Sequence, residues 1–134
     1  MKTIGMIRGM SWESTKFYYE ILNKEVKGRL GGLHSAKVVL YSFDFEIIKK
    51  FQFEGRWEEA TKLLCEAAQT LEQAGADLVI LCTNTMHISA TNIAESIRIP
   101  FFTYRRCNSI PTTKRRQEKY RLTRHKVYNG RRFL

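Results

Sequence analysis

Two spacings of apolar residues alternate along the first hundred positions of the chain. Short apolar runs have the pattern of strands, and longer segments repeat apolar residues every three or four positions, as helices do. Strands are predicted at 2–7, 36–41, 78–82 and from 99 onward. Helices are predicted from Ser11 to a glycine-rich end at 28–32, as a short helical turn at 45–52, over 57–74 and over 87–97.

The run 78–82 is apolar without interruption, which is typical of a strand buried on both faces of a parallel sheet. Strands and helices that alternate in this way favour an α/β fold, with a Rossmann-like parallel sheet flanked by helices. Ligands of such sheets bind beyond the carboxyl ends of the strands. The sequence therefore predicts that chemistry resides in the loops at 8–14, 42–52 and 83–87.

Charge divides the chain into two parts. The whole carries a formal net charge of +10, but residues 1–100 hold 12 Lys and Arg against 12 Asp and Glu. Residues 101–134 hold 11 Lys and Arg against one acid, and they lack alanine, aspartate and methionine. We therefore predict one folded domain over 1–101, followed by a basic, poorly ordered tail over 102–134.

Cysteine usage and hydropathy exclude several classes of protein. The three cysteines form neither an even framework nor a CxxC pair, which excludes a disulfide mini-protein or a zinc-finger module and fits a reducing cytoplasm. No apolar run approaches the length that crosses a bilayer, and the apolar part of 1–8 is too short for a signal peptide. No membrane partner is expected.

The segment Cys82-Thr83-Asn84-Thr85-Met86-His87 concentrates chemistry at the end of a predicted strand. A thiol, two hydroxyls, an amide and an imidazole lie within six residues. Cys82 and His87 find no matching ligand spacing elsewhere, so no metal site is predicted. On these residues alone, a turn that ends a strand and a functional loop are equally good interpretations.

Further motifs are spread over the first three quarters of the chain. They are Met1-Lys2-Thr3-Ile4-Gly5, Gly9-Met10-Ser11-Trp12-Glu13-Ser14-Thr15, Gly31-Gly32-Leu33-His34-Ser35-Ala36, Asp44-Phe45, Gln52 with Gly55 and Trp57, Ala74-Gly75-Ala76-Asp77, and Cys82 to His87. Together they resemble the aspartate/glutamate racemase family, specifically its broad-specificity amino-acid racemases. The resemblance covers about three quarters of the chain, and its motifs are long enough to make chance agreement improbable.

The resemblance implies an enzyme of two similar α/β halves with the active site between them. Each half supplies one acid/base group, and the two invert the α-carbon of an amino acid such as aspartate or glutamate without pyridoxal phosphate or another cofactor. Two groups are needed because inversion removes a proton from one face of the carbon and delivers one to the other. Full-length members are expected to form homo-oligomers.

The family pattern places the acid/base of this half immediately before Asn-Thr, at Thr83. Cys82 is the competitor, since a thiol is the stronger acid, but successive strand residues point to opposite faces. By the same resemblance, Asn84, Thr85, Met10 and Gln52 are expected to contact the substrate. Arg8 replaces a glycine of the family, and we expect it to clash in its loop rather than to bind a substrate carboxylate.

The resemblance implies a second half, with a second catalytic cysteine, after Pro100, and the family motifs expected there do not appear in residues 101–134. Codons for Phe102-Thr103-Tyr104-Arg105-Arg106 can be chosen so that reading one base later gives Leu-His-Ile-Ala followed by Asp or Glu, as the family has. Segments 121–128 and 128–133 recover two further family motifs in the same shifted frame. We therefore expect a frameshift near codon 102 and a truncated product that is inactive alone.

The alternative is a non-catalytic, nucleic-acid-binding protein that uses the tail as a basic arm. Arginines and lysines interleave there with three tyrosines, as in an electrostatic nucleic-acid footprint. If the tail is out of frame, any nucleic-acid binding is incidental charge attraction. Binding through phosphates would weaken steeply with salt, which separates the two hypotheses.

Overall fold

The computed structural model describes residues 1–83 and 85–103, which form a four-stranded parallel sheet with helices on both faces. The strand order is β2-β1-β3-β4. Its elements in chain order are β1 (Ile4–Ile7), α1 (Trp12–Leu30), β2 (Val38–Tyr41), α2 (Phe45–Phe53), α3 (Trp57–Gln73), β3 (Leu78–Leu81), the 3₁₀ helix η1 (Thr85–Ser89), α4 (Ala90–Ser96) and β4 (Phe101–Thr103). The predicted α/β class is confirmed.

All three strand pairs are parallel, and their registers align the carboxyl ends of the strands. Ile7, the last residue of β1, lies opposite Tyr41 of β2 and Leu81 of β3. Leu81 in turn lies opposite Thr103 of β4. The loops that follow β1, β2 and β3 therefore emerge at one edge of the sheet.

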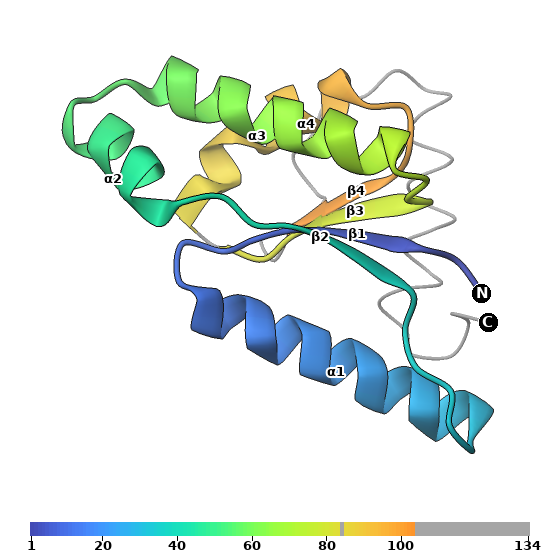
Figure 1. Ribbon diagram of the computed structural model, residues 1–134. Helices are drawn as coiled ribbons and strands as arrows, with labels where there is room; N and C mark the ends of the chain where they lie inside the picture. The colour runs from blue at the N-terminus through green and yellow to red at the C-terminus, as the bar shows by residue number, and fades with distance from the viewer. Residues whose placement is uncertain (84, 104–134) are drawn as a thin grey trace.

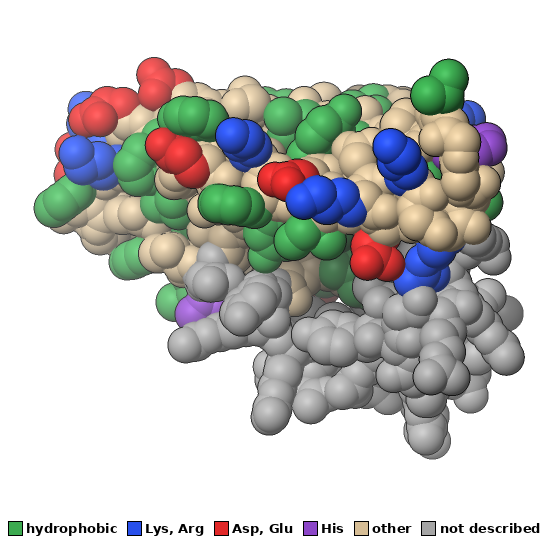
Figure 2. Space-filling view, turned by 90° about the horizontal axis from the view of Figure 1, so that it is seen from below, with side chains coloured by type: hydrophobic (Ala, Val, Ile, Leu, Met, Phe, Trp, Pro, Cys, Tyr) green, Lys and Arg blue, Asp and Glu red, His purple; other side chains and the backbone are tan. Residues whose placement is uncertain are grey.

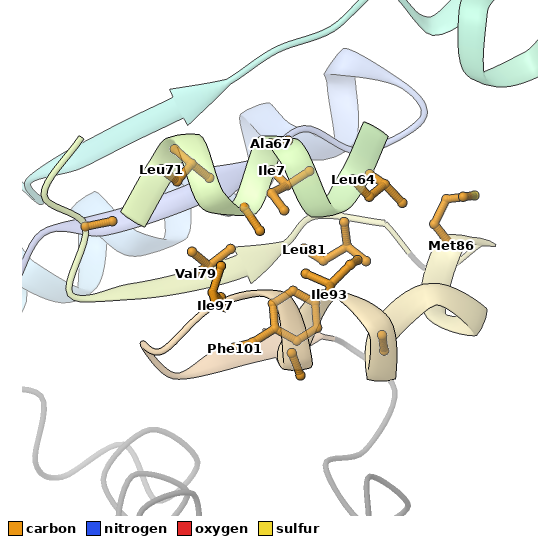
Figure 3. Close-up of a cluster of buried hydrophobic side chains, with 14 of the residues drawn as sticks. Ile7, Leu64, Ala67, Leu71, Val79, Leu81, Met86, Ile93, Ile97 and Phe101 are labelled. Carbon is orange, nitrogen blue, oxygen red and sulfur yellow. The ribbon is translucent and has the colours of Figure 1, made fainter. Parts of the chain in front are cut away.

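The main hydrophobic core lies between the sheet and the layer that contains α3 and α4. In Figure 3 the side chains of Val79 and Leu81 point toward those of α3 and α4, with Phe101 beside Ile93 and Ile97 and Met86 at one end of the cluster. Helix α3 supplies Leu64, Ala67 and Leu71, whose spacing gives the helix one continuous buried stripe. This face of the sheet is well covered.

The opposite face carries α1 and a much smaller core. Among the described elements, Figure 1 shows only α1 below the sheet, and Thr15 is the one buried residue of this helix. The core on this side consists of Ile4, Met6, Leu78 and Cys82, with partly buried neighbours. Several large apolar side chains of α1 stay exposed, and Figure 2 shows apolar side chains interspersed with charged ones on the surface seen from this side.

Local sequence signals account for the helix boundaries. The Ser11 side chain accepts a hydrogen bond from the Glu13 N–H at 3.2 Å and begins α1, as predicted. Gly31 follows Leu30 with φ 72°, and its N–H donates to the Lys27 carbonyl at 2.8 Å. That left-handed conformation favours glycine, so the helix ends within the predicted glycine-rich segment.

Two predicted boundaries differ from the structure. The helix predicted over 87–97 is divided into η1 and α4, because Ser89, the last residue of η1, has φ −87° and ψ 1° and α4 begins only after it. The last strand continues to Thr103. The predicted tail, 102–134, thus has its first two residues in β4, whereas 104–134, including Cys107, lie outside the described residues.

Candidate functional site at the carboxyl edge of the sheet

Cys82 follows β3 directly, and its side chain enters the core on the α1 side. It has no exposed surface and packs with Ile4, Met6 and Leu78. Its backbone N–H donates to the Ile7 carbonyl at 3.0 Å, which fixes the orientation of the residue. Burial raises the pKa of the Cys82 thiol to about 12. A thiol in this position is a neutral core group.

Thr83 lies next to Cys82 but belongs to the opposite side of the sheet. Leu81 packs in the α3 and α4 core and Cys82 in the α1 core, so the alternation of side chains directs Thr83 to the Leu81 side. Thr83 is 8% exposed, and its Oγ1 accepts the N–H of Thr85 at 3.3 Å. Its hydroxyl is therefore held at the carboxyl end of β3.

Gln52 joins two loops that are distant in the sequence. It lies in the last turn of α2, and its Nε2 is 3.0 Å from the Met86 sulfur and 3.9 Å from the Met10 sulfur. Met10 comes from the loop after β1, and Met86 comes from η1 after β3. The structure thus brings the predicted pair Met10 and Gln52 together beside Met86.

The predicted residues therefore separate into two groups. Met10 and Gln52 are in contact, and Thr83 and Thr85 are joined by a hydrogen bond. Thr85 is exposed, whereas Cys82 lies in the core on the other face. Asn84 lies outside the described residues.

At Gly9 the loop after β1 lies directly against the chain at the end of β3. A Cβ at this position would overlap the carbonyl oxygen of Cys82, and its contact with the Ser14 side chain would also be tight. The Gly9 N–H donates to Thr15 Oγ1 at 3.0 Å in a buried setting. Only glycine fits here, so the position of the loop that carries Met10 depends on it.

Arg8 does not clash in this loop, contrary to the expectation from sequence. Its backbone N–H donates to the Tyr41 carbonyl at 3.0 Å and extends the ladder between β1 and β2. Its Nη1 donates to the Phe43 carbonyl. The side chain turns to the α1 face, where there is room for it, and links the segment after β2 to the end of β1.

Two residues at this edge have no assigned role in the sequence interpretation. Met86 is 1% exposed and contacts Gln52, a contact between residues 34 positions apart that no local pattern reveals. Thr103 ends β4, and its buried Oγ1 has no hydrogen-bond partner within the described part of the chain. The sequence could have indicated Thr103 as a site residue, because it is a hydroxyl residue at the end of a predicted strand.

Within residues 1–83 and 85–103, no group of three or more His, Cys, Asp or Glu residues is arranged to hold a metal ion. No helix there is long and apolar enough to cross a membrane.

Comparison with known proteins assigns the chain to a family. A model of the Asp/Glu/hydantoin racemase family matches residues 7–107. The fold also matches a protein from Yersinia pestis assigned to the Asp/Glu racemases, with a TM-score of 0.74 and 50% sequence identity. An aspartate racemase homologue from Pyrococcus horikoshii matches with a TM-score of 0.65 and 32% identity.

The parallel α/β domain described above therefore has the fold of the matched part of these racemase structures. The chain belongs to the Asp/Glu/hydantoin racemase family. Each match covers 77% of this chain but 45% of the solved chain. The chain therefore spans less than half the length of these two relatives.

Proposed function

We propose that this chain forms one half of the active site of a cofactor-independent amino-acid racemase. The reaction is inversion at the α-carbon of aspartate, glutamate or a related amino acid. The observation that supports the proposal is the contact of Gln52 with Met10 and Met86 at the carboxyl edge of the sheet. Thr83, which is largely buried, follows β3 at the same edge. The family membership supplies the reaction class.

Thr83 is the proposed acid/base group of this half. Its hydroxyl is a weak acid, so it requires stabilisation of its deprotonated form. The N–H of Thr85 donates to Thr83 Oγ1 and provides one such interaction. Cys82 is a poorer candidate, because its thiol is buried in the α1 core and its pKa is raised to about 12.

Gln52 and Met10 are the proposed substrate contacts. The Gln52 amide is directed at two thioether sulfurs, and sulfur is a weak hydrogen-bond acceptor. A substrate carboxylate is a much stronger acceptor and would gain a charge-assisted hydrogen bond from the same amide. Asn84 and Thr85 are proposed as further contacts to the carboxylate or the amino group, on the basis of the family resemblance.

We also propose that the chain lacks one of the two acid/base groups that inversion needs. A second acid/base group must face the opposite side of the α-carbon, and the two solved relatives are more than twice as long as the matched region. We propose that the missing half supplies that group, and that the 134-residue chain is inactive without it. Family members with both halves would then be the functional form.

The test uses the encoding gene and its product with the reading frame restored near codon 102. The restored protein is expected to racemise aspartate or glutamate in chiral chromatography. Thr83→Ala should lower the rate by ~10²–10⁴, as loss of a positioned acid/base does, whereas Thr83→Ser should retain activity. Cys82→Ala serves as the control, because it alters the adjacent residue on the other face of the sheet.

Two results would contradict this assignment. If no single-base change near codon 102 restores the family motifs, the frameshift hypothesis is wrong. If the Cys82→Ala variant folds but loses activity while Thr83→Ala keeps it, the acid/base is the thiol and the assignment to Thr83 fails.

A further inference from the structure

A cavity lies on the face of the sheet that α1 covers, opposite the face to which Thr83 belongs. It is formed between the first half of α1 and the edge strand β2, and its volume is about 440 Å³. That volume falls within the range of small-molecule sites. Its lining residues are Met6, Arg8, Trp12, Thr15, Lys16, Tyr19, Val38, Leu40 and Ser42.

The guanidinium of Arg8 gives this cavity an incompletely paired cation. Within the described residues its one hydrogen bond is donated by Nη1 to the Phe43 carbonyl. Its Nε is buried and has no hydrogen-bond partner there. A buried N–H without an acceptor is costly, and a guanidinium binds carboxylates through two parallel N–H groups. The geometry therefore favours an anionic group beside Arg8.

The neighbouring charges leave the cavity cationic. Lys16 lines it from α1 and is exposed. Glu13 is the nearby acid on the same helix, but its carboxylate accepts from the Ser11 hydroxyl, which is the main cause of its lowered pKa. Glu20 is engaged with Lys24 at 2.5 Å. The charge of Arg8 also contributes to the lowered pKa of Glu13, but within the described residues neither acid is hydrogen-bonded to the Arg8 guanidinium.

Aromatic and aliphatic groups line the remainder of the cavity. The side chains of Trp12 and Tyr19 are exposed by 61% and 52%, large values for apolar groups that line a cavity. Met6 is fully buried, and Leu40 is half exposed on the edge strand. An aromatic ring placed here would cover these apolar surfaces and could stack on the indole or the phenol.

We propose that this cavity is a binding site for a small aromatic carboxylate. The carboxylate would pair with Arg8 and Lys16, and the ring would lie against Trp12, Tyr19 and Leu40. A purely apolar ligand would leave the Arg8 N–H groups unpaired. An inorganic anion would leave the aromatic surfaces exposed. The site is separate from the residues proposed for racemisation, so it stands or falls independently of that function.

The test follows the indole N–H resonance of Trp12 in ¹⁵N-labelled full chain. The chain has two tryptophans, and Trp57→Phe assigns the signals because Trp57 begins α3, the helix that packs on the other face. Titration with benzoate or phenylacetate is expected to shift the Trp12 resonance saturably, with a dissociation constant of roughly millimolar order. Benzyl alcohol and inorganic phosphate should each bind at least about ten-fold more weakly.

Substitutions of Arg8 and Lys16 distinguish binding in this cavity from nonspecific attraction of an anion to positive charge. Arg8→Met and Lys16→Gln should weaken benzoate binding, by about ten-fold or more for Arg8. Lys24→Gln is the matched control, since it removes the same charge from α1 outside the cavity. The proposal fails if benzoate produces no saturable shift, if phosphate or benzyl alcohol binds as tightly, or if Lys16→Gln and Lys24→Gln weaken binding equally. If Arg8→Met does not fold, two comparisons still test the proposal: Lys16→Gln against Lys24→Gln, and benzoate against phosphate and benzyl alcohol.

Discussion

Gly9 and the carbonyl of Cys82 are in such close contact that a Cβ on Gly9 would lie only 2.1 Å from the carbonyl oxygen. The contact fixes the loop after β1 against the end of β3, and Met10 is the next residue along that loop. The geometry of the candidate site therefore requires that residue 9 has no side chain.

Gly9→Ala should destabilise the fold, because backbone rather than a flexible side chain must move to make room. We expect a loss of about 2–4 kcal/mol in the free energy of unfolding, measured by urea denaturation. Gly28→Ala is the matched control: it lies in α1 with nothing near its Cβ position. That substitution should be neutral or stabilise by up to about 1 kcal/mol. Equal effects at the two glycines would contradict the packing argument.

Arg8→Gly should also lower stability, which reverses the expectation drawn from the sequence. The substitution removes the hydrogen bond to the Phe43 carbonyl and adds backbone entropy to the unfolded chain. A loss of about 1–2 kcal/mol is expected, seen as a fall of several degrees in the melting temperature. Arg98→Gly provides the control, because Arg98 is exposed and its side chain makes no hydrogen bond in the described part of the chain. An unchanged or higher melting temperature for Arg8→Gly would restore the view that Arg8 is damaging.

Much of the fold follows from local pattern, and the reasons are visible at individual residues. Ser11 is read as an N-cap from its type and position, and its side chain caps α1. The apolar run after Asp77 forms the central strand β3, buried as a parallel strand should be. The sequence does not reveal the division of the helix predicted over 87–97, because the division depends on the backbone angles of Ser89 (φ −87°, ψ 1°) and not on a proline or glycine.

The site was less accessible to sequence reasoning, because its contacts are long-range. The sequence leaves Cys82 and Thr83 as competitors, and the distinction comes from which core each strand face enters. The contact of Gln52 with Met86 depends on how α2 and η1 pack on the sheet. Arg8 was misjudged, because the space available on the α1 face is a property of the packed structure rather than of the loop sequence.

Cys82 should make the stability of the domain fall at high pH. Its pKa is 9.0 as an ordinary thiol and about 12 in the fold, so between these values the unfolded chain loses the proton while the folded chain retains it. The stabilisation is complete below pH 9 and is lost as the pH rises toward 12. The unfolding free energy of the wild type should therefore decline relative to Cys82→Ala by about 1 kcal/mol between pH 8 and pH 10. A constant difference over that range would show that the thiol is not desolvated.

The 134-residue chain should not racemise amino acids by itself. It carries the proposed acid/base Thr83 and the contacting pair Gln52 and Met10. The group proposed for the other face of the α-carbon would come from the second half of the enzyme. Loss of a positioned acid/base costs ~10²–10⁴ in rate, and loss of the opposite wall also removes orientation and exclusion of water. A symmetric dimer would not replace the missing group, because both copies would present the same Thr83 loop.

Incubation of the purified chain with aspartate, glutamate and homoserine in D₂O provides the measurement. Chiral chromatography reports inversion, and NMR reports exchange of the α-proton, which a single acid/base group can catalyse without inversion. Both should stay at the level of a buffer control and of the Thr83→Ala variant. Exchange without inversion that disappears in Thr83→Ala would show that Thr83 acts on one face of the carbon unaided, and the claim of inactivity would then be restricted to inversion. Inversion that disappears in the same variant would overturn the proposal that this chain is half of an active site.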